Sequence, residues 1–536
     1  MAASRAQSAP DRAVWLVFIF FLALYLFTAK GKITVIDGLI RYHVTASIAE
    51  RGSLALPPGW PTTWKLYHHG LPYSYYSLGQ SLVALPFYLV GRAAAGLFPQ
   101  TDPGLITQAA YSFLNPFLVA GLCAVCFAFA RRLGYARPTA LWLAFTLGLG
   151  TVFWEQSKDS FEHPQEALLG LAGILFAYRG LKEQRRLFFA VSGLLFGAAL
   201  LTRESALWFF LPTLAYLFLK SWRQTTAVAA TGDLRPNKLH LLGQAALPVL
   251  LCIAGALPCL LVIGWYNFVR SGSFLLAGHV ATGHFKNFHS SIAWGLAGLL
   301  LSPGRGLLEY NPVLLLLLVF PGSLLLFWRR DRALAALFAA ITLSYLLFYA
   351  HFTNWANGLS WGPRYITAII PLLLLPLGEV FESAYPPPAQ PRLFSVKRAL
   401  VWALFAVSVA LQLTSVLIDH QIWFHEVAVR NQHGENLAIN SVPQNSPILH
   451  QWINLAKVLA PARFGPVQGR QPSEVRGRPA LITTTPFCTG VDFWWLCSPA
   501  GAARLFRFAA ALLLALLVLI SAGLLARRNY RDRHCN

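Results

Sequence analysis

One acidic side chain, Asp37, lies about eight residues beyond the first apolar stretch of the sequence. It opens a long loop, residues 30–78, that separates this stretch from the rest of a very apolar chain. Ionisable groups this close to a bilayer are costly and are commonly functional. A carboxylate there could take a proton from a hydroxyl group or bind a divalent cation. The alternative is that Asp37 only caps the helix predicted after it.

A second acidic segment, residues 155–163, separates two later apolar stretches. It contains Glu155, Asp159 and Glu162 and ends at His163. If this segment approaches the first loop, Asp37 with Asp159 or Glu162 would form a paired acidic site that polarises a hydroxyl. Asp37 and Asp159 would then be the ligands of a divalent metal ion, Mg²⁺ or Mn²⁺. The alternative is a solvated turn whose charges face water.

Arginines follow other apolar stretches at the same predicted membrane level. These residues are Arg203, Arg305 and Arg364. A guanidinium group donates paired hydrogen bonds and stays charged, which suits a phosphate or pyrophosphate headgroup. Each arginine could instead only extend its charge to the membrane surface.

The elements that must position these residues are membrane helices. The chain has 536 residues, of which 56% are hydrophobic and 12% charged, whereas a soluble domain is about a quarter charged. Apolar runs long enough to cross a bilayer predict an all-α polytopic membrane protein with about twelve transmembrane helices. The predicted spans are 13–29, 105–130, 138–154, 164–181, 186–201, 205–219, 243–266, 311–327, 333–350, 364–382, 399–418 and 503–526.

The net charge of +22 reflects this topology and does not indicate a nucleic-acid partner. With the N-terminus in the cytoplasm, every basic cluster falls on the cytoplasmic side, as the positive-inside rule requires. The clusters lie near residues 5–12, 131–137, 182–186, 220–238, 329–332, 392–398 and 527–533. We therefore expect a multi-pass protein of the plasma (inner) membrane, with both termini cytoplasmic and the acids and arginines outside.

The same reasoning assigns residues 79–98 to an interfacial or re-entrant helix, because counting them as a span would move the basic clusters outside. The first outside loop then covers residues 30–104, and the helix after Asp37 should also lie at the interface. The expected domains are a membrane domain (1–418), an extracytoplasmic subdomain (419–502), and a last helix with a basic tail (503–536).

Two of the seven cysteines, Cys488 and Cys497, lie in this outside subdomain. They could form a disulfide in an oxidising compartment, or remain two thiols. The histidines at 279, 284 and 289 recur every five residues. That spacing does not place them on one helix face, so no zinc site is expected there.

Several motifs resemble the GT-C superfamily of glycosyltransferases. They are YSLGQSLVALPFYLVGR (76–92), LLTRESALWFFLP (200–212), SPGRGLLEYNP (302–312) and SWGPRY (360–365), together with the acid of the first loop and the second acidic segment. The resemblance covers about residues 13–385. It is to the branch of the protein mannosyltransferases, the lipid A aminoarabinose transferase and their bacterial relatives.

This resemblance implies an inverting transfer of a sugar from a polyprenyl-phosphate donor to an acceptor hydroxyl on a lipid, a glycan or a protein. Asp37 matches the first-loop catalytic carboxylate, either as general base or as metal ligand. Asp159, with Glu162 as the competing choice, matches the second acid. Arg203 matches a donor-phosphate contact, and Arg364 and Arg305 are assigned similarly.

The chain departs from the family at two positions. Gly38 stands where many relatives have a second acid, and Leu71 stands where many have a lysine before proline. Lys65 is the candidate to replace that missing charge. A different reading is a transporter or flippase for a lipid-linked substrate, but such proteins usually show internal repeats and polar residues deep inside broken spans. Here the polar residues gather at helix exits, which favours an enzyme over a transporter or a non-catalytic scaffold.

Overall fold

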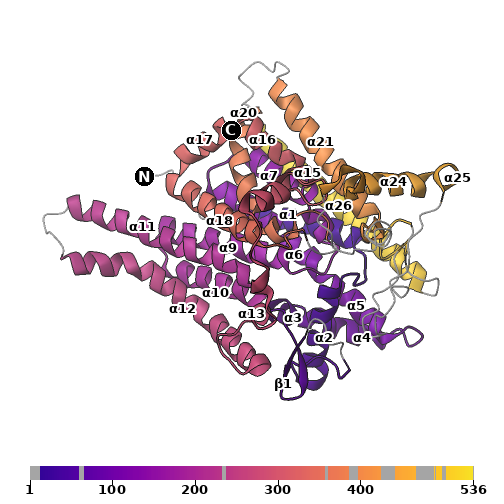
Figure 1. Cartoon of the computed structure of the whole chain (residues 1–536). Coiled ribbons are helices and arrows are strands. Elements are labelled where there is room, and N and C mark those ends of the chain that lie inside the picture. The colour runs from indigo at the N-terminus through magenta and orange to yellow at the C-terminus, as the bar shows by residue number, and fades with distance from the viewer. Residues whose placement is uncertain are drawn as a thin grey trace.

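The computed structural model describes residues 12–59, 65–231, 237–356, 360–384, 396–423, 441–465, 488, 490–497 and 503–534. Helices form nearly all of its regular structure (Figure 1). Six helical segments are long and apolar enough to cross a membrane. They are Pro103–Arg132, Lys238–Ser271, Arg332–His351, Arg364–Ala384, Val396–Leu417 and Phe506–Arg528. The polytopic all-α class is therefore confirmed.

The expected count of about twelve spans is not confirmed. A seventh candidate exists if α16 (Leu315–Val319) and α17 (Gly322–Arg330) form one span, but the axis bends by 83° between them. The bend falls at Pro321, which cannot donate a helix hydrogen bond. Other predicted spans form helices shorter than the roughly 20 residues that a bilayer needs: α1 (Ala13–Thr28), α7 (Arg137–Leu149) and α10 (Arg186–Thr202).

The remaining helices complete the bundle. They are α6 (Leu114–Arg132), α8 (Phe153–Gln156), α9 (His163–Glu183), α11 (Leu207–Thr231), α12 (Lys238–Ser271), α13 (Gly278–Ala281), α14 (Ile292–Leu301), α15 (Leu307–Tyr310), α18 (Arg332–His351), α19 (Ile370–Leu374), α20 (Gly378–Ala384), α21 (Val396–Leu417), α24 (Pro447–Leu459), α25 (Pro461–Phe464) and α26 (Ala503–His534). Short 3₁₀ turns include η2 (Glu204–Ala206), η4 (Pro312–Leu314), η5 (Arg364–Ile369) and η6 (Leu375–Leu377).

Basic residues from several predicted cytoplasmic clusters meet at one end of the bundle. Arg132 at the end of α6 pairs with Glu183 at the end of α9, at 2.9 Å. Arg330 of α17 pairs with Glu379 of α20 at 2.6 Å. The second acidic segment lies at the other end of α9, since it ends where that helix begins. The acids of the predicted site and these basic clusters therefore lie at opposite ends of the molecule.

The first loop folds into a compact group of elements beside the bundle, at the bottom of Figure 1. It contains α2 (Ile36–Arg51), an antiparallel hairpin of β1 (Lys65–His68) and β2 (Leu71–Ser74), α3 (Gly79–Val83), α4 (Leu85–Ala95) and α5 (Pro103–Ser112). The expected helix at residues 79–98 is split into α3 and α4 at Ala84, two residues before Pro86. It is not among the candidate spans of the described residues.

Helix α2 differs from the surface helix expected after Asp37. Its residues Leu39, Ile40 and Val44 are buried, and so is the charged side chain of Arg41, which is only 2% exposed. A charged residue of an interfacial helix is expected to face water, but a salt bridge inside the protein allows a charged group to be buried. This packing fixes α2 against the second acidic segment.

Candidate active site

Asp37 lies in the first turn of α2 and forms an ion pair with Arg364. Arg364 Nη1 donates to Asp37 Oδ2 at 3.0 Å, and Arg364 Nη2 donates to the hydroxyl of Tyr365 at 3.0 Å. The two charged side chains are 15% and 13% exposed, so solvent reaches the pair. The N-cap residue of α2 is Val35. Asp37 is therefore not the capping residue of this helix.

Glu162, the other acid proposed to join Asp37, is held by two arginines. Its Oε2 lies 2.8 Å from Arg41 Nη2, and its Oε1 lies 3.7 Å from Arg203 Nε. Burial by itself would raise the pKa of Glu162, but the guanidinium groups of Arg41 and Arg203 outweigh burial, and the pKa is lowered. Glu162 is thus an ionised carboxylate that fixes two cations.

Arg203 follows α10 and is held from several sides. Its Nη1 lies 2.6 Å from His163 Nδ1 and 3.4 Å from Glu166 Oε2. Its Nη2 donates to the hydroxyl of Tyr349 at 2.9 Å. Tyr349 in turn stacks on Tyr365, the residue that accepts from Arg364. Arg203 and Arg364 therefore belong to one connected group, although they come from distant parts of the sequence.

Some donors in this group have no hydrogen-bond acceptor among the described residues. They are the buried Nε and Nη1 atoms of Arg41 and the buried Nε of Arg364. A buried charged donor without an acceptor is costly. An anion with several oxygens would satisfy such donors with charge-assisted hydrogen bonds. The arginines predicted to bind phosphate, Arg203 and Arg364, thus lie together, and Arg41 joins them.

Asp159 has different partners from Asp37. Lys30 Nζ donates to Asp159 Oδ1 at 2.7 Å and also lies 3.3 Å from Asp419 Oδ1 and 3.8 Å from Glu155 Oε1. Burial, followed by the nearby charge of Glu155, raises the pKa of Asp159 to about 7. The backbones of the two acidic segments do touch, because Gly38 of α2 packs against Ser160. The structure therefore places Asp37 with the arginines around Glu162, and Asp159 in a separate buried group.

Glu155, Asp159 and His420 could hold a metal ion. Each offers a ligand atom, these atoms lie within 4.8 Å of one another, and all three residues are buried. Oxygen and imidazole ligands suit Mn²⁺ or Zn²⁺. Lys30 already supplies a positive charge at Asp159 and Glu155. A metal shared by Asp37 and Asp159, as the sequence predicts, would need both carboxylates to leave their present ion pairs.

The other predicted site residues are Arg305, Lys65 and the two cysteines of the outside subdomain, and the structure describes the side chains of all but Lys65. Arg305 donates from Nε to the carbonyl of Ala356 at 3.3 Å and from Nη1 to the carbonyl of Ser360, and burial lowers its pKa to about 10. It thus supports the loop that leads to Arg364. Lys65 begins β1, but its side chain lies outside the described residues. Cys488 and Cys497 form a disulfide.

Sequence reasoning missed five charged residues of these groups, which are Arg41, Glu166, Lys30, Asp419 and His420. Arg41 had a usable signal, since it stands four residues after Asp37 and i, i+4 residues share a helix face. Lys30 and His420 had none, because their partners are 125 or more residues away in sequence. Only the packing of distant helix ends brings such groups together.

Comparison with solved structures finds similarity over most of the chain. The crystal structure of ArnT from Cupriavidus metallidurans bound to undecaprenyl phosphate matches with a TM-score of 0.46 and 14% identity, over 84% of this chain and 80% of ArnT. The oligosaccharyltransferase AglB from Archaeoglobus fulgidus, in complex with an inhibitory peptide and a dolichol-phosphate, matches with a TM-score of 0.42 and 12% identity.

The AglB match covers 87% of this chain but only 61% of AglB. A structure of the same enzyme in complex with Zn and sulfate matches at 11% identity with a TM-score of 0.41, over 87% of this chain and 59% of AglB. ArnT and AglB are GT-C glycosyltransferases. No protein-family model matches the sequence, and a comparison with curated proteins finds no match.

Proposed function

We propose that this protein is an inverting glycosyltransferase that moves a sugar from a polyprenyl-phosphate donor to an acceptor hydroxyl on the outer face of the membrane. The observation that carries the proposal is that Arg41 and Arg203 converge on Glu162 while Arg364, in the same connected group, pairs with a solvent-accessible Asp37. This group combines a base with an anion site. It lies at the end of the bundle opposite to the basic clusters, which the positive-inside rule assigns to the cytoplasm.

In the proposed reaction Asp37 is the general base. The acceptor oxygen attacks the anomeric carbon while its proton passes to the Asp37 carboxylate. The bond between that carbon and the phosphate oxygen breaks, and its electron pair leaves with the polyprenyl phosphate. Attack on the face opposite to the leaving group inverts the anomeric centre. Arg364, which holds Asp37 Oδ2, keeps the base oriented.

The arginines stabilise the phosphate as the leaving group gains negative charge. Arg203 is fixed by His163, Glu166 and Tyr349, and Arg41 has two buried guanidinium nitrogens, Nε and Nη1, without acceptors in the described residues. Glu162 acts in this scheme by holding Arg41 and Arg203, not as a second base. We assign Arg305 the role of supporting the loop before Arg364.

The proposed location follows from the same arrangement. The prenyl tail of the donor stays among the lipids, and its phosphate and sugar reach the helix ends where Asp37 and the arginines lie. The acceptor is a hydroxyl group of a lipid, a glycan or a protein. A bound divalent ion at Glu155, Asp159 and His420 would add positive charge beside the second acidic segment, and no step above passes through it.

The first test is Asp37→Asn. Transfer of ¹⁴C-labelled hexose or pentose from undecaprenyl phosphate by the purified protein should fall about 10²- to 10⁴-fold, the usual contribution of a general base. The matched control is Asp102→Asn in the same loop. Asp102 caps α5 by accepting from the backbone N–H of Gly104, and asparagine also caps helices well, so transfer should be unchanged. A normal rate in Asp37→Asn, in protein that is correctly folded, would remove the central assignment. Movement of the intact lipid without sugar release would favour a flippase.

A further inference from the structure

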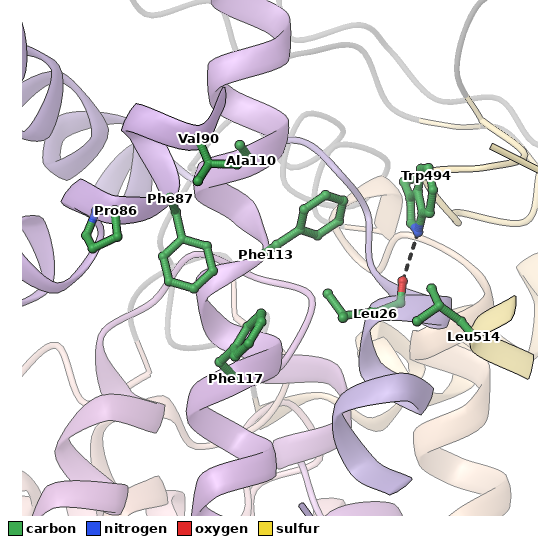
Figure 2. A pocket seen from close by; sticks show the side chains of 9 residues that line it. All are labelled: Leu26, Pro86, Phe87, Val90, Ala110, Phe113, Phe117, Trp494 and Leu514. Atoms are coloured by element: carbon green, nitrogen blue, oxygen red, sulfur yellow. Dashed lines mark hydrogen bonds between the residues drawn. The ribbon is translucent and has the colours of Figure 1, made fainter. Parts of the chain in front are cut away.

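The disulfide closes a short loop, residues 488–497, which we call the cystine loop; it lies against the end of α1. Trp494 donates from its backbone N to the carbonyl of Ala29 at 2.9 Å, and from Nε1 to the carbonyl of Leu26 at 2.8 Å (Figure 2). Trp495 Nε1 donates to the carbonyl of Phe27 at 2.9 Å. The cystine loop thus donates hydrogen bonds to three backbone carbonyl groups at the C-terminal end of α1.

Gly31 shows how closely the two segments fit. Its φ of +64° is a conformation that suits glycine. A Cβ atom added there would lie 2.5 Å from Cβ of Trp494. The turn from α1 into the first loop is therefore shaped by the cystine loop.

Asp492, in the middle of the cystine loop, contacts three distant segments. Its carboxylate lies 3.2 Å from Lys32 Nζ and 3.6 Å from Lys158 Nζ. Its carbonyl accepts from Lys158 Nζ at 3.0 Å, and its backbone N donates to the carbonyl of Leu417 at 2.7 Å. Asp492 is completely buried, and Lys158 is 1% exposed.

Both lysines belong to the segments that carry the proposed site. Lys32 precedes Asp37 in the first loop, and Lys158 precedes Glu162 in the second acidic segment. These two segments also meet at Gly38 and Ser160. A buried carboxylate between the two lysines therefore sets how the segment with the base lies relative to the segment that holds the arginines.

We propose that Asp492 is a positioning residue for sugar transfer and that the cystine loop exists to hold it between Lys32 and Lys158. Testing this inference by measuring sugar transfer assumes the function proposed above. Without the carboxylate the two ammonium groups would repel each other, and Lys158 would remain buried with reduced compensation, an arrangement that is strongly unfavourable. The first loop and the second acidic segment would then separate, and Asp37 would lose its alignment with the phosphate site.

The test uses Asp492→Asn, the double variant Cys488→Ser with Cys497→Ser, and a matched control, Asp331→Asn. Asp331 is an ion-paired carboxylate at the opposite end of the bundle, 3.2 Å from Lys220. In the two test variants kcat should fall at least about tenfold, a larger change than in the KM for the donor. Arg203 is fixed by residues of α9 and α18, outside the cystine loop, so its part of the anion site should survive, whereas Arg41 lies on α2 and would move with Asp37.

A second readout does not depend on activity. Lys32 and Lys158 should resist acetylation by a water-soluble reagent in the wild type and react in both test variants, as measured by peptide mass spectrometry. If the wild type transfers no sugar, the function proposed above fails, and the labelling still decides whether the cystine loop positions these segments. Wild-type kcat together with a protected Lys158 in Asp492→Asn would overturn the inference. An equal loss of kcat in Asp331→Asn would also overturn it, because the effect would then be a general one on folding.

Discussion

Asp37 and Glu162 are both carboxylates near arginines, but their surroundings suit Asp37 to act as a base and Glu162 to hold two cations. Asp37 has one arginine partner and is 15% exposed, so an acceptor hydroxyl can reach it. Glu162 is 9% exposed at its side chain and pairs with both Arg41 and Arg203. A carboxylate held by two guanidinium groups is a poor base, because the proton would compete with both cations.

Arg203→Lys tests the anion site at the scale of one residue. The planar guanidinium reaches His163, Glu166 and Tyr349 at once, and a lysine ammonium lacks that fork geometry. The KM for the polyprenyl-phosphate donor should rise about tenfold or more in initial-rate assays.

The control for this substitution is Arg132→Lys at the basic end of the bundle, whose pair with Glu183 is partly exposed. Partly exposed pairs contribute about 1 kcal/mol or less, so its kinetics should match the wild type. If Arg203→Lys also left the KM unchanged, Arg203 would not contact the donor.

At the scale of elements, the decisive contact is between α2 and the second acidic segment. A Cβ at Gly38 would lie 2.6 Å from Cβ of Ser160 and 3.1 Å from its carbonyl oxygen. This approach leaves no room for a side chain, so the contact requires glycine at position 38.

Gly38→Ala should therefore lower stability by about 1–3 kcal/mol, the usual cost of overpacking a tight contact, and reduce transfer. Thermal unfolding in detergent measures the first effect. Gly243→Ala in α12 is the matched control, because nothing lies within 4 Å of its added Cβ and alanine favours helices. Adding Ser160→Gly to Gly38→Ala should restore part of the loss. No change in Gly38→Ala would show that α2 can move away from Ser160.

At the scale of the whole molecule, buried charges connect parts of the chain that are far apart in sequence. Lys30 contacts Glu155, Asp159 and Asp419, and His420 Nδ1 lies 3.0 Å from Glu155 Oε1. With Lys32, Lys158 and Asp492, this group joins the exit of α1, the second acidic segment, the end of α21 and the cystine loop. Such a group should respond to pH.

Asp159 should make the stability of the protein depend on pH. Its pKa is raised from 3.8 to about 7, mainly by burial and to a smaller extent by the charge of Glu155. A raised pKa in the folded state gives stability that is fully present below about pH 4 and is lost as the pH rises through 7. The melting temperature of the wild type should therefore fall relative to Asp159→Asn between pH 5 and pH 8. The corresponding loss of unfolding free energy between pH 5 and a pKa of about 7 should be at most about 3 kcal/mol, at about 1.4 kcal/mol per pKa unit.

Neighbouring groups do not reverse this sign below pH 8, and the pKa of Lys158, which burial lowers to about 8, acts in the opposite direction only above that value. The pKa of His420 is also raised, which acts in the same direction. The pKa of Glu155 is lowered from its ordinary value of 4.5, so this group changes the stability only at pH values below about 4.5. Asp102→Asn should follow the wild type at every pH. Parallel curves for wild type and Asp159→Asn would contradict a carboxyl group that titrates near neutrality.

Apolar runs and local spacing predicted much of this molecule. They predicted helices at the positions of the twelve expected spans, a helical segment at residues 79–98 before α5, and the acids and arginines at helix exits. They did not predict which helices are long enough to cross a bilayer, because length limits, prolines and bends act at particular residues such as Pro321.

Hydropathy and the positive-inside rule depend only on composition along the chain, so they suffice to predict a polytopic helical membrane protein with its charges divided between two ends. The partners of those charges follow from tertiary packing alone. Asp159 pairs with Lys30, Glu162 with Arg41, and Asp492 with Lys32 and Lys158. Each of these ion pairs depends on the distance between helix ends, and packing sets that distance, not spacing along the chain.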